Sequence, residues 1–393
     1  MRLPKGFRGS GVNAGLKKGR PDVALIVADG GANAAAVFTR NRFVAAPVVL
    51  SKRGLTASGG RVTGVVVNAG CANAVTGKEG LAAARRVRRA TAELLSCPPE
   101  EVFLASTGVI GVVLPDEKVT AALPGAVAAL SASGLDAVSR AILTTDVGPK
   151  VAQAGYAWKG RRGSVVGVAK GAGMIHPDMA TMLAFVMTDA PATPAFLKAA
   201  LVKACGVSFN AISVDGDTST NDTVLLMASG RLGGPEMTSL DEAKGFVDAL
   251  TRVCRDLAWK IVRDGEGAAR VMEVVVTGAR SEKDARLAAH AVATSPLVKT
   301  ALNGGDPNWG RILAAVGRSG ARFSTRNVSL KVGKLALVKD GEPTPYREKD
   351  AAKLFGQERV PLLIDLGAGT GTTTLLAADL GHDYVSCNAD YRS

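Results

Sequence analysis

The stretch KGAGMIHPDMATMLAFVMTD, residues 170–189, is the part of the sequence that decides the fold. Its first half is rich in glycine and predicts a loop. Its second half, from Met182 to Met187, is almost wholly apolar. A short apolar run of this kind predicts a strand that is covered on both faces, as in layered α/β folds. Thr181 stands where the loop meets the strand, directly after the small residue Ala180.

A threonine at this position has two interpretations. Its hydroxyl is a poor nucleophile unless a base stands beside it, and a cut between Ala180 and Thr181 would make the threonine's own α-amine that base. The pKa of an α-amine is roughly 8, which is close to working pH. The alternative is that Thr181 only begins a strand, as a β-branched residue often does, and chemistry alone favours this alternative.

The remaining patterns predict a mixed α/β protein with many strands. Three apolar runs between residues 23 and 51, VALIVAD, AAAVFT and AAPVVLS, are interpreted as strands joined by tight turns. Residues 81–95 and 240–262 are amphipathic and predict helices. Residues 273–277 predict one more strand, and we place the domain boundary just after it, near Gly278.

Composition limits the class of protein. A chain of 393 residues suits two domains, and 47% hydrophobic with 21% charged residues is typical of a globular protein. No run of eighteen apolar residues would span a membrane, and the first residues lack the apolar segment of a secretory signal. The five cysteines are odd in number and have no metal or redox spacing. We therefore expect a cytoplasmic protein with no membrane partner.

The net charge of +13 raises the question of nucleic-acid binding. The densest basic run is RRVRR, residues 85–89, on the solvated face of a predicted helix. Stacking aromatic residues do not interleave with it, and no nucleic-acid motif accompanies it. We expect no nucleic-acid partner, and a basic field can instead attract anionic metabolites.

Two further segments carry candidate chemistry. Thr107 and Gly108 follow an apolar strand, and a threonine hydroxyl and a glycine amide there could both donate to one oxygen, as the oxyanion of an acyl transfer requires. A Ser-Thr-Gly sequence is also a common turn. Glu266 stands between two glycines after the long predicted helix, where it could meet a substrate ammonium or be a plain surface charge.

Three other patterns argue against a cofactor. The polar block SVDGDTSTNDT, residues 213–223, does not match the spacing of a calcium loop, and we prefer a polar turn that supports a cleft to a metal site. The three histidines are scattered, so we expect no metal. The glycine run LGAGTG, residues 366–371, mimics a nucleotide-binding turn, but only 22 residues follow it, too few for that fold.

Taken together, these segments resemble, in the same order, the ornithine acetyltransferase family, the bifunctional glutamate N-acetyltransferases of arginine biosynthesis. The similar blocks are NAGCANA at 68–74, STGVIG at 106–111, TTD at 144–146, GAGMIHPDMATMLAF at 171–185, SFNAISVDGDTSTNDT at 208–223, GEGA at 265–268, GGDPNWGRI at 304–312 and NADYRS at 388–393. A series of blocks in register is far more specific than any one of them.

The resemblance implies roles for individual residues. Thr181 would be the nucleophile, freed by self-cleavage after Ala180, and Thr107 and Gly108 would form the oxyanion hole. The substrate would be bound by Thr145, Lys170, Thr181, Glu266, Asn388 and Ser393. The family usually has a further threonine where this chain has Val147, so the hydroxyl that reaches the substrate could belong to Thr144 or to Thr145.

The resemblance also implies the architecture and the reaction. Residues 1–278 would form a four-layer αββα sandwich, and residues 279–393 a smaller α/β domain whose tail returns to the active site. The acetyl group of N-acetylornithine would pass to glutamate through an acetyl-threonine in a ping-pong mechanism, without a cofactor, and acetyl-CoA could be a second donor. The family suggests an assembly of two copies of each cleaved piece.

Two other functions stay open. A self-processing amidohydrolase or aminopeptidase of similar fold would use water in place of glutamate. A non-enzymatic binding protein on this fold would keep an uncut chain.

Overall fold

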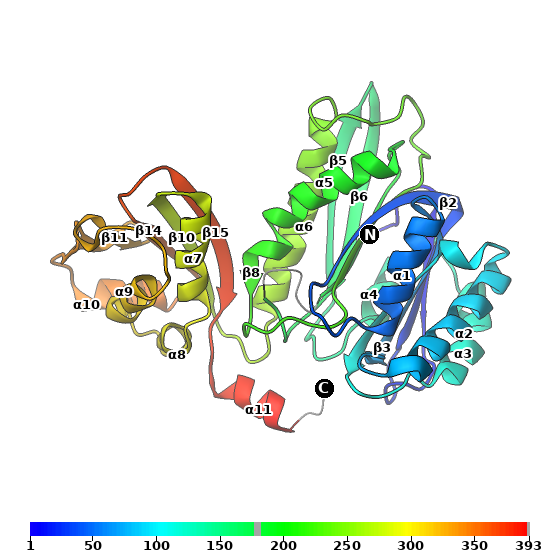
Figure 1. Ribbon diagram of the computed structural model, residues 1–393, viewed down its shortest axis with the longest axis horizontal. Coiled ribbons are helices and arrows are strands. Elements are labelled where there is room, and N and C mark those ends of the chain that lie inside the picture. Colours follow the sequence, from blue (N-terminus) through cyan, green and yellow to red (C-terminus); the bar gives the residue numbers. More distant parts are fainter. Residues whose placement is uncertain (177–181, 391–393) are drawn as a thin grey trace.

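The computed structural model describes residues 1–176 and 182–390, whose strands form two sheets with helices packed against them (Figure 1). The larger sheet has eight strands: β4-β3-β2-β9-β7-β6-β5 in spatial order, with β1 paired to β2. Their bounds are β1 Phe7–Val12, β2 Val23–Phe38, β3 Arg61–Cys71, β4 Val102–Val109, β5 Lys150–Trp158, β6 Arg161–Lys170, β7 Leu183–Thr188 and β9 Thr223–Ala228.

The larger sheet folds back on itself along β2, its longest strand. The first half of β2 pairs with β1 and β3, and its second half pairs with β9. The pairing with β3 shifts register between Val27 and Ala32, around Gly30 and Gly31, whose φ angles are positive. Glycine adopts such angles without strain, so this pair allows the strand to bend and the sheet to form two layers.

Alternating side chains then build three cores. Ala24 and Ile26 of β2 face inward and pack with Phe185 of β7 between the two layers of sheet. Leu25, between them, faces outward toward α2 and α3, whereas Val186 faces outward on the other side toward α5 and α6. Because side chains alternate between the two faces of each strand, the layers follow one another as helices, sheet, sheet and helices. The predicted four-layer αββα sandwich is confirmed.

In the described part of the chain, six α-helices accompany this sandwich. They are α1 Ala46–Ala57, α2 Gly77–Leu95, α3 Asp116–Ala128, α4 Leu135–Ala141, α5 Pro194–Gly206 and α6 Lys244–Arg263. In Figure 1, α1, α2 and α3 lie on one outer side, and α5 and α6 lie on the other.

The strand predicted for residues 45–51 is wrong, because this segment begins α1. Pro47 lies in the first turn, where its fixed φ and missing N–H suit a helix start. The buried residues Val48, Ser51 and Gly54 follow each other at intervals of three, which is a helical period. The Ser51 hydroxyl also donates to the Leu104 carbonyl at 2.8 Å, which attaches the helix to β4.

The smaller sheet has seven strands in the order β13-β12-β11-β14-β10-β15-β8. Their bounds are β8 Ile212–Ser213, β10 Val271–Ala279, β11 Ser329–Val332, β12 Leu335–Lys339, β13 Glu342–Pro343, β14 Arg359–Asp365 and β15 Gly371–Ala378. The helices α7 Glu282–Ala293, α8 Pro296–Gly304, α9 Trp309–Gly317 and α10 Glu348–Phe355 belong to this domain. The predicted boundary near Gly278 falls inside β10, which pairs with β14 and β15, so the strand placed in the first domain belongs to the second.

The chain returns to the first domain after β15. Helix α11, His382–Asp390, extends back beneath the sandwich in Figure 1 and has no buried residue. Its position is set by the polar contacts described below. No helix in the described ranges is long and apolar enough to cross a membrane.

Candidate functional site

A cavity of about 130 Å³ opens where the larger sheet meets α11. Seven of the residues singled out from the sequence line it together: Thr107, Gly108, Thr144, Thr145, Lys170, Glu266 and Asn388. They come from segments up to 281 positions apart in the chain, so only the fold brings them together. The predicted nucleophile Thr181, the cleavage-site residue Ala180 and the terminal Ser393 lie outside the described residues.

Thr107 and Gly108 stand at the end of β4, beside the parallel strand β3. Gly108 has a φ of 125°, and a Cβ built there would lie 2.3 Å from the carbonyl carbon of Gly70. Only glycine fits at this position, because the backbone of β4 passes so close to that of β3 here. Thr107 is almost fully buried and lies one residue earlier in the same pair of strands.

The polar block after β8 supports this wall of the cavity. The side-chain amide of Asn221 donates to the Ser106 carbonyl at 2.8 Å and to the Ala72 carbonyl at 2.7 Å. Ser106 donates in turn to Asn68 at 2.6 Å. Asp215 and other residues of this block line the cavity itself. The block is thus the polar turn expected from the sequence, and it joins β3, β4 and β9 at one point.

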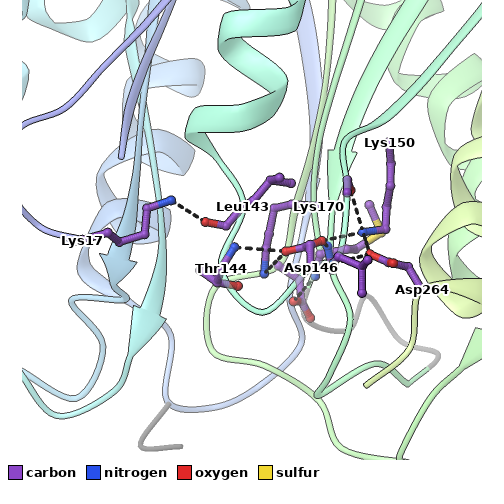
Figure 2. A network of polar contacts seen from close by, with 12 residues as sticks. Lys17, Leu143, Thr144, Asp146, Lys150, Lys170 and Asp264 are labelled. Atoms are coloured by element: carbon purple, nitrogen blue, oxygen red, sulfur yellow. Dashed lines mark hydrogen bonds and ion pairs between the residues drawn. The ribbon is translucent and has the colours of Figure 1, made fainter. Parts of the chain in front are cut away.

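Lys170 reaches the cavity from the end of β6 and is fixed by Asp146 (Figure 2). Its Nζ lies 3.7 Å from Asp146 Oδ2, and Lys150 Nζ lies 2.6 Å from Asp146 Oδ1. The backbone amides of Gly171 and Thr144 donate to the same carboxylate at 2.6 and 3.1 Å. Burial alone would raise the pKa of Asp146, but the charges of Lys170 and Lys150 outweigh it and hold this pKa below its ordinary value.

Asp264, the residue after α6, closes this network. Its carboxylate binds Lys150 Nζ and accepts the Val147 amide at 3.0 Å. The Val147 side chain is 90% exposed, whereas Thr144 and Thr145 both line the cavity. Residue 147, where the family usually has a threonine, therefore contributes only its backbone amide to this network. The hydroxyl that contacts the substrate could still belong to Thr144 or to Thr145.

Glu266 and Asn388 meet across the cavity. The side-chain amide of Asn388 donates to Glu266 Oε2 at 2.9 Å. Gly267, with a φ of 66°, lets α11 approach, because a Cβ at this position would lie 2.3 Å from the Tyr384 backbone nitrogen. Tyr384 lines the cavity, and its hydroxyl donates to Asp215 at 3.5 Å. Sequence reasoning missed Tyr384, although its spacing of four residues from Asn388 would place both on one helix face.

The cavity is acidic except at Lys170. Three carboxylates line it, those of Asp215, Asp217 and Glu266. Among the described residues that line it, one is a lysine, Lys170. The Asp215 carboxylate accepts backbone amides of Met174 and Ile175, yet burial raises its pKa. One cation and several carboxylates suit a small ligand that carries both a carboxylate and an ammonium group. Among the described residues, no group of three or more His, Cys, Asp or Glu side chains could hold a metal ion.

Comparison with known proteins agrees with this arrangement. The profile of the ArgJ family matches residues 8–393. The arginine biosynthesis bifunctional protein ArgJ of Chlorobaculum tepidum is 45% identical over 391 residues, covering 99% of this chain and 96% of that protein. Its counterpart in Nitratidesulfovibrio vulgaris is 47% identical over 397 residues, covering 99% of both. The crystal structure of the Bacillus halodurans protein of the same name has a TM-score of 0.51 and 41% identity, and covers 53% of this chain and 98% of that chain. The chain therefore belongs to the ArgJ family.

Proposed function

We propose that this protein transfers the acetyl group of N-acetylornithine to glutamate and so acts as a glutamate N-acetyltransferase of arginine biosynthesis. Membership of a family whose curated relatives are named for arginine biosynthesis supports the pathway. The observation that carries the proposal is the meeting of Thr107, Gly108, Lys170, Glu266 and Asn388 in one cavity.

The proposed enzyme first cuts itself between Ala180 and Thr181. The cut would give pieces of 180 and 213 residues that stay associated through the sheet, because β7 lies between β6 and β9. The crystallised relative is compatible with this step, since 98% of its chain matches only 53% of the present one.

Acetyl transfer would then occur in two halves. The hydroxyl of Thr181 attacks the acetyl carbonyl, and the free α-amine of Thr181 accepts the proton. The Thr107 hydroxyl and the Gly108 amide donate to the oxyanion that forms. Ornithine leaves, glutamate enters, and its amine takes the acetyl group from the threonine ester. Both halves transfer an acetyl group to or from an α-amine, so one cavity serves donor and acceptor.

Charge supports the choice of substrate. Lys170 would bind a substrate carboxylate, and Glu266 would pair with an ammonium group such as the side chain of N-acetylornithine. The several carboxylates of the cavity favour such a cation. We further propose that no cofactor is needed, that acetyl-CoA is a second donor, and that the enzyme works in the cytoplasm as two copies of each piece. Five free thiols support a reducing compartment.

Product analysis tests the proposal. Purified protein is supplied with N-acetylornithine, with and without glutamate, and a parallel assay replaces the donor by acetyl-CoA. We expect N-acetylglutamate and ornithine to form together, and little acetate without glutamate. Acetate released at the same rate without glutamate would make the protein a hydrolase and overturn the assignment.

A further inference from the structure

Asp222 carries a buried carboxyl group that the proposed acetyl transfer does not use. The residue precedes β9 and is 1% exposed. Its Oδ1 accepts the backbone amide of Met182 at 3.0 Å. Its Oδ2 has no hydrogen-bond partner in the described part of the chain, although this atom is fully buried. Nearly all buried polar atoms have partners, so an unpartnered carboxylate oxygen indicates a group that has another use.

The surrounding contacts leave this carboxyl little freedom. The Asp222 carbonyl accepts the Thr39 amide at 2.9 Å, and the Thr223 amide donates to the Met182 carbonyl at 3.1 Å. Asn221, the residue before, is held by two backbone carbonyls of the cavity wall. Asp222 is therefore fixed between β7 and β9 and directed at the first residue described after the predicted cut.

The backbone amide that Asp222 accepts belongs to the residue next to the predicted nucleophile, since Met182 directly follows Thr181 in the chain. In the uncut chain the nitrogen of Thr181 belongs to a peptide bond and cannot accept a proton. The base of the mature enzyme thus does not exist when self-cleavage starts, and that reaction needs a different proton acceptor.

We propose that Asp222 accepts the hydroxyl proton of Thr181 during self-cleavage and is no longer needed as a base once the chain is cut. The inference rests on the self-processing proposed above. The Thr181 oxygen bonds to the carbonyl carbon of Ala180 while its proton passes to Asp222. The bond between that carbon and the Thr181 nitrogen then breaks, and the proton moves from Asp222 to the nitrogen. Water hydrolyses the resulting ester, with the new amine as base, and restores the hydroxyl.

The electrostatics of the site agree with this role. Burial raises the pKa of Asp222 well above its ordinary value, although the Met182 amide, the charge of Lys170 and the nearby Ser219 hydroxyl act in the opposite direction. A carboxylate with a raised pKa is a stronger base than an exposed one. Lys170 is the charged side chain whose attraction favours the ionised form of Asp222.

The Asp222→Asn variant separates this role from simple positioning. Asparagine keeps an oxygen that can accept the Met182 amide, but it cannot take up a proton at neutral pH. Asp189→Asn is the matched control, because Asp189 is also buried, follows the opposite end of β7 and accepts Tyr156 and Ser164. Wild type, both variants and Asp222→Glu are made by cell-free synthesis, and the uncut fraction is followed over time on denaturing gels.

We expect Asp222→Asn to cut itself about a hundredfold more slowly than wild type or more, as is usual when a general base is lost. Asp189→Asn should match wild type, and each cleaved Asp222→Asn molecule should turn over N-acetylornithine at nearly the wild-type rate. Asp222→Glu retains a carboxylate and should cut faster than Asp222→Asn, which keeps the test open if the asparagine variant folds poorly.

Three results would overturn the inference. Cleavage of Asp222→Asn at the wild-type rate would remove Asp222 from the reaction. Slow cleavage of both aspartate-to-asparagine variants, or equally slow turnover by the cleaved molecules of Asp222→Asn, would make the effect structural. An uncut but active wild type would contradict self-processing itself, whereas the first two results would leave the proposed acetyl transfer intact.

Discussion

Thr107 and Gly108 occupy the most constrained part of the cavity wall. Gly108 passes so close to Gly70 that any side chain would collide with the backbone of β3. Asn221 holds the carbonyl of Ser106, immediately before them. The backbone that carries the two proposed donors is thereby held in place before any substrate arrives. Donors that need no rearrangement when negative charge develops are the most effective kind of electrostatic catalyst.

Thr107→Ala should lower kcat by on the order of a hundredfold or more while KM changes little. The reason is that a donor directed at a developing oxyanion acts mainly in the transition state. Steady-state kinetics with N-acetylornithine and glutamate measure both constants, and Thr120→Ala on α3 is a control away from the cavity. Self-cleavage of Thr107→Ala should also slow. A variant with wild-type kcat would reduce Thr107 to a turn residue.

Three elements are joined by the ion-pair network around Asp146 and Asp264. Lys150 begins β5, Lys170 ends β6, and Asp264 follows α6, so the network connects two strands and a helix behind the cavity (Figure 2). Asp146, Lys150 and Lys170 are all almost fully buried. Burying charges is costly, and it is tolerated here because each charge has a partner of opposite sign.

Asp146→Asn should lower the free energy of unfolding by about 3 kcal/mol or more, because it leaves two buried lysines with a single carboxylate. Denaturant unfolding of the purified protein measures the change. Asp248→Asn removes one partner of the exposed pair with Lys244 and should cost at most about 1 kcal/mol. Equal losses in the two variants would show that the buried network contributes no more than a surface pair.

The elements themselves were predicted unevenly from sequence. Apolar runs such as residues 183–188 predict buried strands correctly, since a strand covered on both faces needs only a local pattern. The same kind of apolar run led to a wrong strand prediction around Val48. This segment begins a helix, because a proline suits the first helical turn and an apolar run can also form the buried face of a helix. The sheet to which β10 belongs is decided by its pairing with β14, almost ninety residues later in the chain. No local sequence pattern contains that information.

The candidate site was also predicted only in part from the sequence. Residues recognised from the family motifs, such as Lys170 and Glu266, do line the cavity, although their roles stay predictions. The groups around them were not foreseen: Asp146 between two lysines, and Tyr384 on Asp215. Each of these contacts joins residues that belong to separate elements or loops. They follow from tertiary packing, which the sequence motifs do not describe.

The two sheets form one structure through a few shared contacts. β8, from the chain of the first domain, pairs with β15 at the edge of the smaller sheet. Lys299 of α8 supports this edge, since its Nζ donates to the carbonyls of Val214 and Ala378. Burial lowers the pKa of Lys299 to about 8, although Asp215 and Asp379 partly oppose the shift. The junction therefore contains a lysine that loses its proton more easily when the protein is folded.

This lysine makes stability depend on pH in alkaline solution. Between about pH 8 and 10.5 the unfolded chain binds the proton and the folded one does not, so the free energy of unfolding should rise with pH in this window. The contribution should approach about 1 kcal/mol per pH unit. Other groups titrate there too, so the measurement compares denaturant unfolding of wild type with Lys299→Met from pH 8 to 10. Parallel pH curves for the two proteins would contradict a shifted Lys299.

The most direct test of the proposed mechanism is intact-mass spectrometry of the purified protein before and after addition of N-acetylornithine without glutamate. We expect two pieces, of 180 and 213 residues, in the untreated sample. After addition of the donor, the piece that starts at Thr181 should become one acetyl group heavier, and glutamate should remove that group. A single uncut chain of 393 residues that transfers acetyl at full rate would contradict both self-processing and the acetyl-threonine at residue 181.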